Sequence, residues 1–295
     1  MMSDMKPEKI FARALDPIHI GAGGYRLGRV DNTIVRDPAT DVPKIPGTSM
    51  AGVVRAFTEI IKEEGKLKDV NIDEVFGTGT KKGILRFYDG QIILFPVSSI
   101  QGTVWITTKE LLEYWLGEIK DNGGVKIKIP DEIGDEVYAV KGINTVKYLN
   151  LGWLLLEVKN VTDGKEVVLP SKIDKWVKKI VVVSDKLFSH IVNDNLEVRT
   201  SVRINPETGA AVEGALFTYE AMPRGTILGF EIGVDNAMAK KRNIDDNIVN
   251  NIITAVSTYI RNLGIGGMGT RGFGRIELMI EERGKSGEGD FNAQS

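Results

Sequence analysis

The amino-acid sequence predicts an α+β fold, because strand and helix patterns follow one another unevenly along the chain. A strand–helix–strand order occurs near each end, and residues 195–220 alternate apolar and polar side chains over two long arms. Together they predict a βαββαβ, ferredoxin-like (RRM-like) sheet, formed by 1–100 and 179–280, with helices on one face. It would carry an inserted subregion at 101–178, where the pattern weakens, and a projecting β-hairpin near 190–222.

The first half of the chain gives four elements. Residues 8–16 alternate as a strand does, and residues 17–46 form a polar loop whose length indicates a function. Residues 48–64 predict an amphipathic helix that Thr48 or Ser49 would cap. Residues 83–97 indicate two strands joined by a hairpin turn at Asp89-Gly90.

The second half continues in the same way. Short patterns predict a helix, two strands and the hairpin, then a long helix whose apolar residues recur every three or four positions. A glycine-rich stretch and a last strand follow, and the polar tail 281–295 is expected to be disordered. The elements are helix 108–119, strand 179–183, hairpin 195–220, strand 226–234, helix 243–263, glycines 264–274 and strand 275–280.

Composition excludes several classes of protein. The 295 residues contain no cysteine, which excludes a disulfide scaffold and thiolate chemistry and fits an intracellular, cytoplasmic protein. Two histidines are too few for an all-histidine zinc site, and no apolar run is long enough to span a membrane. The formal net charge of −2 excludes a simple polycation, although it leaves room for a local basic groove.

The glycines near the C-terminus are the most informative pattern. Residues 264–269 match G-x-G-x-x-G, but a dinucleotide site needs that turn between a strand and a helix, and here the order is reversed. A longer pattern, G-x-G-x(5)-G-x-G, ends at Gly274 and is flanked by Arg261, Arg271 and Arg275. It suits close approach to a polyphosphate. The alternative is a tight connection packed under the sheet, with its arginines paired to acids.

That glycine pattern is the signature of the RAMP superfamily, the ferredoxin-like RNA-binding proteins of CRISPR systems, which this chain resembles. Further segments look like the backbone subunits of type III effector complexes, above all the fourth, repeated subunit of the III-B (Cmr) complex. The equivalent III-A (Csm) subunit is a near alternative. These segments are 17–23 (PIHIGAG), 30–32 (VDN), 45–49 (IPGTS) with Arg55, 183–191 (VSDKLFSHI) and 215–220 (ALFTYE).

The resemblance implies a function. Copies would stack head to tail along a guide RNA (crRNA) beside other Cmr subunits, each holding guide in a palm while a thumb hairpin flips a base. An aspartate in the first loop, matching Asp31, would cut target RNA with a divalent ion, magnesium or manganese. Because an ordinary aspartate pKa of about 3.9 makes a weak base at pH 7, metal binding or orientation of the 2′-hydroxyl suits Asp31 better than proton abstraction.

Other residues are predicted to touch RNA. Loop arginines beside Asp31 suit phosphates, though solvated side chains are an equal alternative, and the start of the first helix suits a guide phosphate. The hairpin arginines lie on alternating positions, but a plain surface hairpin is the alternative. The predicted RNA-binding residues are Arg26, Arg29, Arg36, Ser49, Arg55, Arg199, Arg203, Gly266, Arg271, Gly272 and Gly274.

Two alternative functions remain open. The chain could be an RNA-binding subunit without chemistry, in which case Asp31 would be a turn residue. It could process guide RNA alone with His19 as acid–base, although that histidine fits a structural role better; His190 is expected in a buried segment. Asp37 and Asp41 could be additional ligands. Charge favours RNA: residues 261–276 sum to +3, whereas 59–74 sum to −3.

Overall fold

The computed structural model describes residues 7–23, 30–117, 127–144, 146–160, 167–245 and 247–279. Arg26, Arg29 and the tail from residue 281 lie outside these ranges. Within them the α+β class is confirmed, because helices accompany one large sheet of mixed parallel and antiparallel strands. No helix of the described part has the length and apolar character needed to cross a bilayer.

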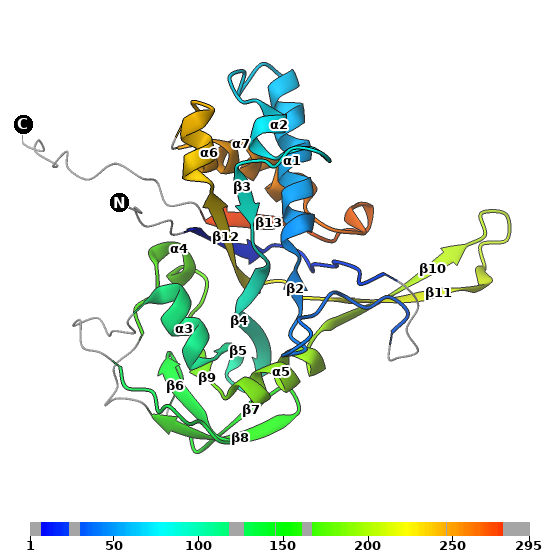
Figure 1. The fold of residues 1–295 in the computed structure, drawn as a ribbon. Coiled ribbons are helices and arrows are strands. Elements are labelled where there is room, and N and C mark those ends of the chain that lie inside the picture. The colour runs from blue at the N-terminus through cyan, green and yellow to red at the C-terminus, as the bar shows by residue number, and fades with distance from the viewer. Residues whose placement is uncertain are drawn as a thin grey trace, which may run out of the picture.

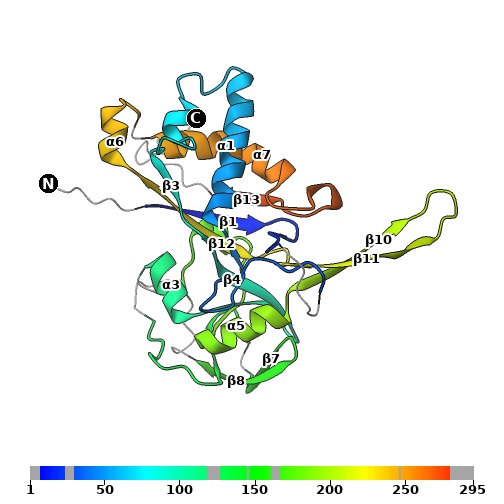
Figure 2. The same cartoon turned by 45° about the vertical axis from the view of Figure 1, so that its right-hand side comes forward.

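Four strands and two long helices, whose arrangement Figure 1 shows, contribute to the larger apolar core, which also includes residues between 104 and 196. They are β1 Glu8–Ala14, α1 Gly47–Glu63, β4 Gly90–Ser99, β12 Ile227–Val234, α7 Ile248–Leu263 and β13 Ile276–Met279. The strands lie in the order β13, β1, β12, β4, and each neighbouring pair is antiparallel. The helices pack against each other on one side of these strands, as Figure 2 also shows.

The sheet continues through the predicted inserted subregion, 101–178, and includes β9, which follows the predicted end of that subregion. From β4 the order is β5, β9, β6, β8, β7, with parallel pairing of β5 with β9 and of β6 with β8. A second apolar core lies here, with Ile93 and Leu94 of β4 contributing to it. The elements are β5 Gly102–Thr107, α3 Lys109–Leu116, β6 Val137–Lys141, β7 Tyr148–Leu151, β8 Leu154–Asn160, β9 Ile180–Val182 and α5 Asp185–Asp194.

The predicted hairpin at 195–220 is present and projects from the body (Figures 1 and 2). Its strands are β10 Glu197–Ile204 and β11 Ala211–Ala221, and they form a two-stranded sheet of their own. Cross-strand pairing runs from Glu197 opposite Ala221 outward, with a register shift between Val202 and Ile204. Apolar side chains remain exposed along it. They are Val198, Val202, Ile204, Leu216 and Phe217.

The predicted hairpin turn at Asp89-Gly90 is wrong. Both β3 (Leu85–Phe87) and β4 pair antiparallel with β12, one after the other along its length, so the chain bends without reversing. Gly90 permits the bend because a Cβ there would lie 2.3 Å from the ring of Phe230. An Asp-Gly pair favours a turn locally, but pairing with the same neighbouring strand on both sides overrides that preference here.

The predicted cap of α1 is also wrong. The helix begins at Gly47 after Pro46, so Thr48 and Ser49 lie inside the first turn and neither caps it. The acceptor comes from far along the chain, since Asp89 Oδ1 accepts the Gly47 N–H at 2.8 Å. A cap supplied across 42 residues leaves no signal in local spacing.

Several short elements were not predicted. A separate short helix precedes α7, which therefore begins later than residue 243. The glycine stretch itself contains one 3₁₀ turn. These elements are β2 Lys44–Ile45, α2 Ile72–Val75, α4 Ser171–Asp174, α6 Asn236–Lys241 and η1 Gly269–Arg271.

Asp89→Ala should lower stability, because Asp89 serves α1 and also pairs with Lys44 of β2 at 2.7 Å. Loss of a capping acceptor costs about 1 kcal/mol. The hydrogen bonds from Lys44 and then from Gly47 lower the pKa of Asp89. A lowered folded-state pKa stabilises the protein above the unfolded-state value of about 3.9, and this contribution is lost as pH falls through the folded-state pKa.

Thermal unfolding at pH 7 and in acid checks this prediction. The Tm difference between wild type and Asp89→Ala should be present at pH 7 and should shrink in acid. Asp69→Ala, at an exposed position, is the matched control and should change Tm little at either pH. A difference for Asp89→Ala that is the same at both pH values would contradict the assignment.

Candidate functional site

Three segments far apart in the sequence meet where the β10–β11 hairpin leaves the body. They are the first loop (residues 17–46), the glycine loop (264–274) and the hairpin base (218–220). Asn32 pairs with β11, since its N–H donates to Thr218 O and its carbonyl accepts from Glu220 N, both at 3.0 Å. The glycine loop contacts the first loop through Gly267 N, which donates to His19 O at 3.0 Å. We call this meeting point the junction.

Asp31, the predicted catalytic residue, is exposed at the junction. Its Oδ2 accepts hydrogen bonds from the backbone N–H and the hydroxyl of Thr218, both at 2.8 Å. Its own N–H donates to the same hydroxyl at 2.9 Å. The N–H of Thr218, and then its hydroxyl, lower the pKa of Asp31. The side chain is therefore an ionised carboxylate with a defined orientation, open to solvent.

Arg36, predicted to contact phosphate, is engaged within the protein. Its Nη2 donates to Glu220 Oε1 at 2.6 Å and its Nε to Asn193 Oδ1 of α5 at 3.0 Å. Glu220 Oε2 accepts the Ile34 N–H at 3.3 Å. Only 19% of the Arg36 side chain is exposed, and Asp41 lies 3.8 Å from its Nε. Arg36 thus fixes the first loop to the hairpin base and to α5, and a phosphate contact by it stays a prediction.

His19 is buried beneath the junction. Its Nδ1 lies 2.7 Å from Glu220 O, and its ring meets those of Tyr219 and Phe273 edge to face. These contacts fit the structural role that the sequence favoured. His190, by contrast, is exposed on α5, so its expected burial is wrong, because the helix turns this position outward.

The glycine loop uses its glycines in two ways. Gly266 and Gly274 have positive φ, and a Cβ on either would lie within 2.6 Å of a backbone oxygen, of His19 and Ile265 respectively. They permit close packing of the protein on itself, as in the alternative stated above. Gly272 also has positive φ, but nothing lies within 4 Å of its Cβ position, so it remains open for a ligand.

Several arginines lie around this loop, and they outnumber the acidic side chains that pair with them. Arg271 donates to Tyr219 Oη at 2.9 Å, which ties the glycine loop to the hairpin base. Arg199 of β10 lies over the Phe273 ring at 4.8 Å and pairs with Glu197 at 2.5 Å. Arg275 pairs with Asp16 at 2.5 Å.

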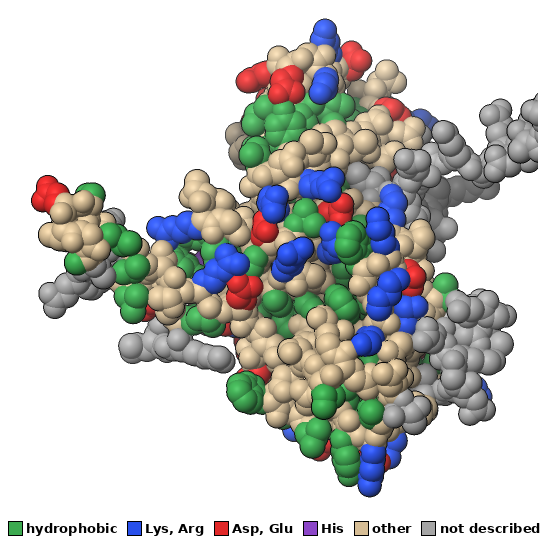
Figure 3. Space-filling model, turned by 180° about the vertical axis from the view of Figure 1, so that it is seen from behind, with side chains coloured by type: hydrophobic (Ala, Val, Ile, Leu, Met, Phe, Trp, Pro, Cys, Tyr) green, Lys and Arg blue, Asp and Glu red, His purple; other side chains and the backbone are tan. Residues whose placement is uncertain are grey.

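Three further arginines extend the cluster: Arg13 of β1, Arg224 just before β12, and Arg261 of α7. The hydrogen bond from Arg275 comes first in lowering the pKa of Asp16, and the charges of Arg224 and Arg199 add to it. Arg224 and Arg261 likewise oppose the charge on Arg13, which pairs with Glu277 at 3.2 Å. Figure 3 shows Lys and Arg side chains gathered across the middle of the rear face, with few acids between them. We call Arg13, Arg199, Arg224, Arg261 and Arg275 the arginine cluster.

Two predicted residues belong to α1 rather than to the junction. Ser49 is half-buried in the first turn of that helix. Arg55 is engaged through all three guanidinium nitrogens, with Glu59 at 2.9 Å, Asp73 at 3.1 Å and the carbonyl of Gly77 at 2.5 Å. It ties α1 to the loop around α2. RNA contacts by Ser49 and Arg55 stay predictions. The same holds for Arg203, whose side chain is not among those that the structure describes.

The junction does not provide a complete metal site from protein groups alone. Among the described residues, no three His, Cys, Asp or Glu side chains converge where they could hold an ion. Asp37 is occupied by the Ala39 and Thr40 N–H groups and by Lys44, and Asp41 lies near Arg36. The segment 24–29, outside the described ranges, contains no such side chain either. Within the described ranges, the predicted metal ligand Asp31 therefore belongs to no group of three such side chains.

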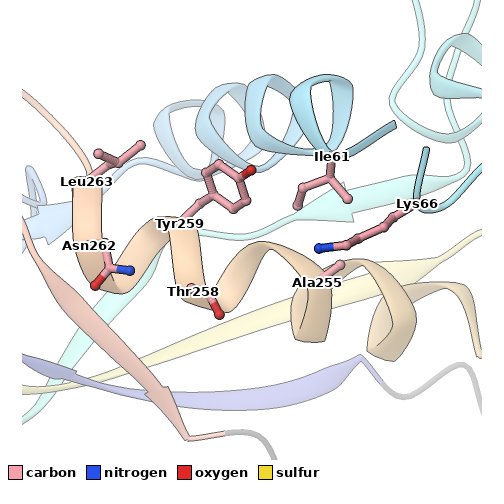
Figure 4. Close-up of a pocket in the computed structure, with 7 residues that line it drawn as sticks. All are labelled: Ile61, Lys66, Ala255, Thr258, Tyr259, Asn262 and Leu263. Atoms are coloured by element: carbon pink, nitrogen blue, oxygen red, sulfur yellow. The ribbon is translucent and has the colours of Figure 1, made fainter. Parts of the chain in front are cut away.

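A shallow hollow lies elsewhere, between α1 and α7 (Figure 4). Its walls are mostly apolar, and Tyr259 at its side donates a hydrogen bond to Glu64. No residue of the junction or of the arginine cluster lines it. The lining residues are Ile61, Lys66, Ala255, Thr258, Tyr259, Asn262 and Leu263.

Comparison with known proteins places this site in a family. The model of the RAMP superfamily matches residues 11–277, so the chain belongs to that superfamily. The resemblance to the fourth Cmr subunit is confirmed too. The "CRISPR system Cmr endoribonuclease Cmr4" of Pyrococcus furiosus is 27% identical, over 94% of this chain and 97% of that protein.

Solved structures share the fold. The "Cryo-EM structure of the Type III-B Cmr-beta bound to cognate target RNA" contains a chain with a TM-score of 0.69 and 19% identity, covering 93% of this chain and 98% of that one. The "Crystal structure of oligomeric Cmr4 from Pyrococcus furiosus" gives 0.60 and 22%, covering 93% and 98%.

Sequence reasoning missed three residues of this site. Thr218 lies within the 215–220 motif, but only the pairing of β11 with the first loop shows that it meets Asp31. Arg13 and Arg224 join the cluster because β1 and β12 are neighbours. The available signal for Arg224 was its place in a Pro-Arg-Gly turn beside a strand.

The two uses of glycine predict unequal effects of substitution. Gly272→Ala should cost about 1 kcal/mol, because only the left-handed conformation is strained there. Gly274→Ala has the same strain plus a Cβ 2.2 Å from Ile265 O, and overpacking of this kind adds about 1–3 kcal/mol. Denaturant unfolding of the two variants measures the difference, and equal losses would contradict the packing role of Gly274.

Proposed function

We propose that this chain is a repeated backbone subunit of a type III-B (Cmr) RNA-guided complex, which binds guide RNA and cleaves complementary target RNA. The observation that carries the proposal is the oriented, ionised Asp31 at the junction of the hairpin, the glycine loop and the arginine cluster. Endoribonuclease action at one such carboxylate per copy would cut a bound target at regular intervals.

The architecture supports this proposal. Strand order β13-β1-β12-β4 with α1 and α7 on one side is the arrangement of a ferredoxin-like palm. The projecting β10–β11 hairpin, with its exposed apolar side chains, would be the thumb that enters between guide and target. Asp31 lies where this thumb joins the palm.

The comparisons support it as well. The Pyrococcus furiosus relative is named an endoribonuclease, one similar structure is described as bound to cognate target RNA, and another as oligomeric. We infer that guide RNA, target RNA, further copies of this chain and other Cmr subunits are its partners. Because the relative and both similar structures are Cmr proteins, the III-B complex is favoured over the III-A (Csm) alternative.

The chemistry follows from the site. The target 2′-oxygen would attack the adjacent phosphorus and the bond from phosphorus to the 5′-oxygen would break, which leaves a 2′,3′-cyclic phosphate and a 5′-hydroxyl. The 2′-hydroxyl gives up a proton and the leaving oxygen gains one. Because the pKa of Asp31 is lowered, its carboxylate is a poor base, and its role would be to accept a hydrogen bond from the 2′-hydroxyl and orient it for attack.

We propose that a divalent ion, magnesium or manganese, would be coordinated mainly by the bound RNA. When bound, such an ion supplies charge neutralisation at the phosphate. Since the described residues bring no group of three candidate ligands together at Asp31, RNA phosphate oxygens and water would have to complete the coordination. The described residues alone do not form that centre.

The arginine cluster supplies the electrostatic part of RNA binding. Its five guanidinium groups share the three carboxylates of Asp16, Glu197 and Glu277, which leaves a net positive charge on the cluster. Guanidinium groups suit phosphate oxygens and carry no base preference, so sequence choice would come from guide–target pairing.

The structure disfavours one of the two alternative functions and leaves the other to be tested. A guide-processing nuclease that uses His19 needs that ring to reach RNA, whereas it is buried and lies 2.7 Å from a carbonyl. A purely structural RNA-binding subunit accounts for the fold and the arginines, but it gives no reason for an exposed carboxylate held by two bonds. Asp31 separates the second alternative from the proposal.

Asp31→Asn in the assembled complex should abolish cleavage of complementary RNA while guide content and assembly stay unchanged. The amide keeps the size of the side chain and removes the negative charge. Asp41→Asn is the matched control: Asp41 is exposed in the same loop at φ 58°, a conformation that Asn tolerates. Gel analysis of labelled target measures cleavage. Wild-type cleavage by Asp31→Asn would rule out the catalytic assignment.

Arg224→Ala should weaken guide binding a few-fold. It should also make the negative slope of log affinity against log salt less steep by about 1, as loss of one phosphate contact does. The effect should be similar for guides of different sequence. Lys68→Ala, exposed in the acidic stretch 59–74, is the control and should leave both quantities unchanged. Filter binding over a salt series gives the slopes, and equal slopes for both variants would contradict a role of the cluster in phosphate binding.

A further inference from the structure

We propose that Thr218 is a positioning residue for Asp31, and that through it the position of the β10–β11 hairpin controls cleavage. The inference rests on the proposed function, because it presumes that Asp31 acts on target RNA. It adds a second residue to the site and a physical link between the hairpin and the carboxylate.

The contacts of Thr218 with Asp31 are reciprocal. The hydroxyl donates to Asp31 Oδ2 and accepts from Asp31 N–H, while the backbone N–H of Thr218 donates to the same Oδ2. An aspartate side chain rotates about two bonds, so one contact would leave its direction free. Two donors on one oxygen, with the main chain bound to the same hydroxyl, define that direction although the side chain is exposed.

The main chain around Asp31 also follows the hairpin. Asn32 pairs in parallel with Tyr219 and exchanges hydrogen bonds with Thr218 O and Glu220 N at 3.0 Å. The segment that holds Asp31 is therefore attached to β11 as a short extra strand. Any displacement of β11 carries Asp31 with it.

The hairpin is held to the body at its base, by Asn32, Arg36 and Arg271, and its outer part projects. Its two strands form a sheet separate from the large one, and among the described residues β11 joins the body near Met222, which pairs with Ile18. The exposed apolar residues Leu216 and Phe217 directly precede Thr218. Contact of RNA with these side chains would thus act on the backbone that positions Asp31.

Substitutions that remove or restore the Thr218 hydroxyl test its role. Thr218→Val keeps the shape and the backbone N–H bond but loses both hydroxyl bonds. Thr218→Ser restores the hydroxyl without the methyl group. Thr218 is half-buried, so Thr218→Ala serves as a second hydroxyl-free variant that introduces no new bulk.

The experiment uses the assembled complex with guide and labelled complementary RNA. Cleavage rate at saturating target and target affinity are measured separately for wild type, the three Thr218 variants and Asp31→Asn. We expect Thr218→Val and Thr218→Ala to cut about tenfold to a hundredfold more slowly, as loss of a hydrogen bond to a charged, positioned group does. Target affinity should stay within about twofold, and Thr218→Ser should regain most of the rate.

Each outcome decides between the claims. Wild-type rates for the two hydroxyl-free variants, with Asp31→Asn inactive, would overturn the role of Thr218 and leave the proposed function standing. A Thr218→Ser rate as low as that of Thr218→Val would also overturn it, because the hydroxyl would then not be the cause. Full activity of Asp31→Asn would overturn the proposed function itself. A loss of target affinity with unchanged saturating rate would assign Thr218 to RNA binding and reject positioning.

Discussion

The pairing of Glu220 with the first loop is the interaction on which the rest of the site depends. Its carboxylate binds Arg36 and the Ile34 N–H, its own N–H binds Asn32 O, and its carbonyl lies against His19. Glu220 is only 9% exposed, so removal of Arg36 would leave a buried charge without its partner, which is strongly unfavourable. The network explains why Arg36 and His19, both attractive as RNA-contacting groups, are instead occupied within the protein.

Much of the fold could be predicted because its signals are local. Alternation of apolar residues gave β1, β12 and the hairpin, and helical spacing gave α1 and α7 within a few residues. The errors have one cause in common. Asp89-Gly90 carries a local turn signal, and Thr48 carries a local cap signal, but contacts with Phe230, Gly47 and Lys44 decide what these residues do.

The site was less predictable than the fold, because contacts between segments far apart in the sequence decide what its residues do. The resemblance identified Asp31, and the structure then placed it in a setting that suits the assignment. Thr218 lies 187 positions away, and no spacing rule connects the two. The glycine pattern was interpreted as an approach for phosphate, but for Gly266 and Gly274 it serves close packing, and Gly272 alone among the three keeps open space. A pattern of glycines marks a constraint on the backbone without stating whether protein or ligand imposes it.

An exposed carboxylate that joins no cluster of acidic or histidine side chains among the described residues is a weak catalytic site in isolation. Asp31 has neither the burial that raises a pKa toward neutrality nor a cluster that would hold an ion without RNA. If it acts on target RNA as proposed, the geometry of the reaction has to be completed by the RNA, which must bring a 2′-hydroxyl and its phosphate into line beside the carboxylate. Such a site cuts poorly where the strand is unpaired and free to move. Dependence on guide pairing would then follow from the incompleteness of the protein site itself, without any recognition of sequence by side chains.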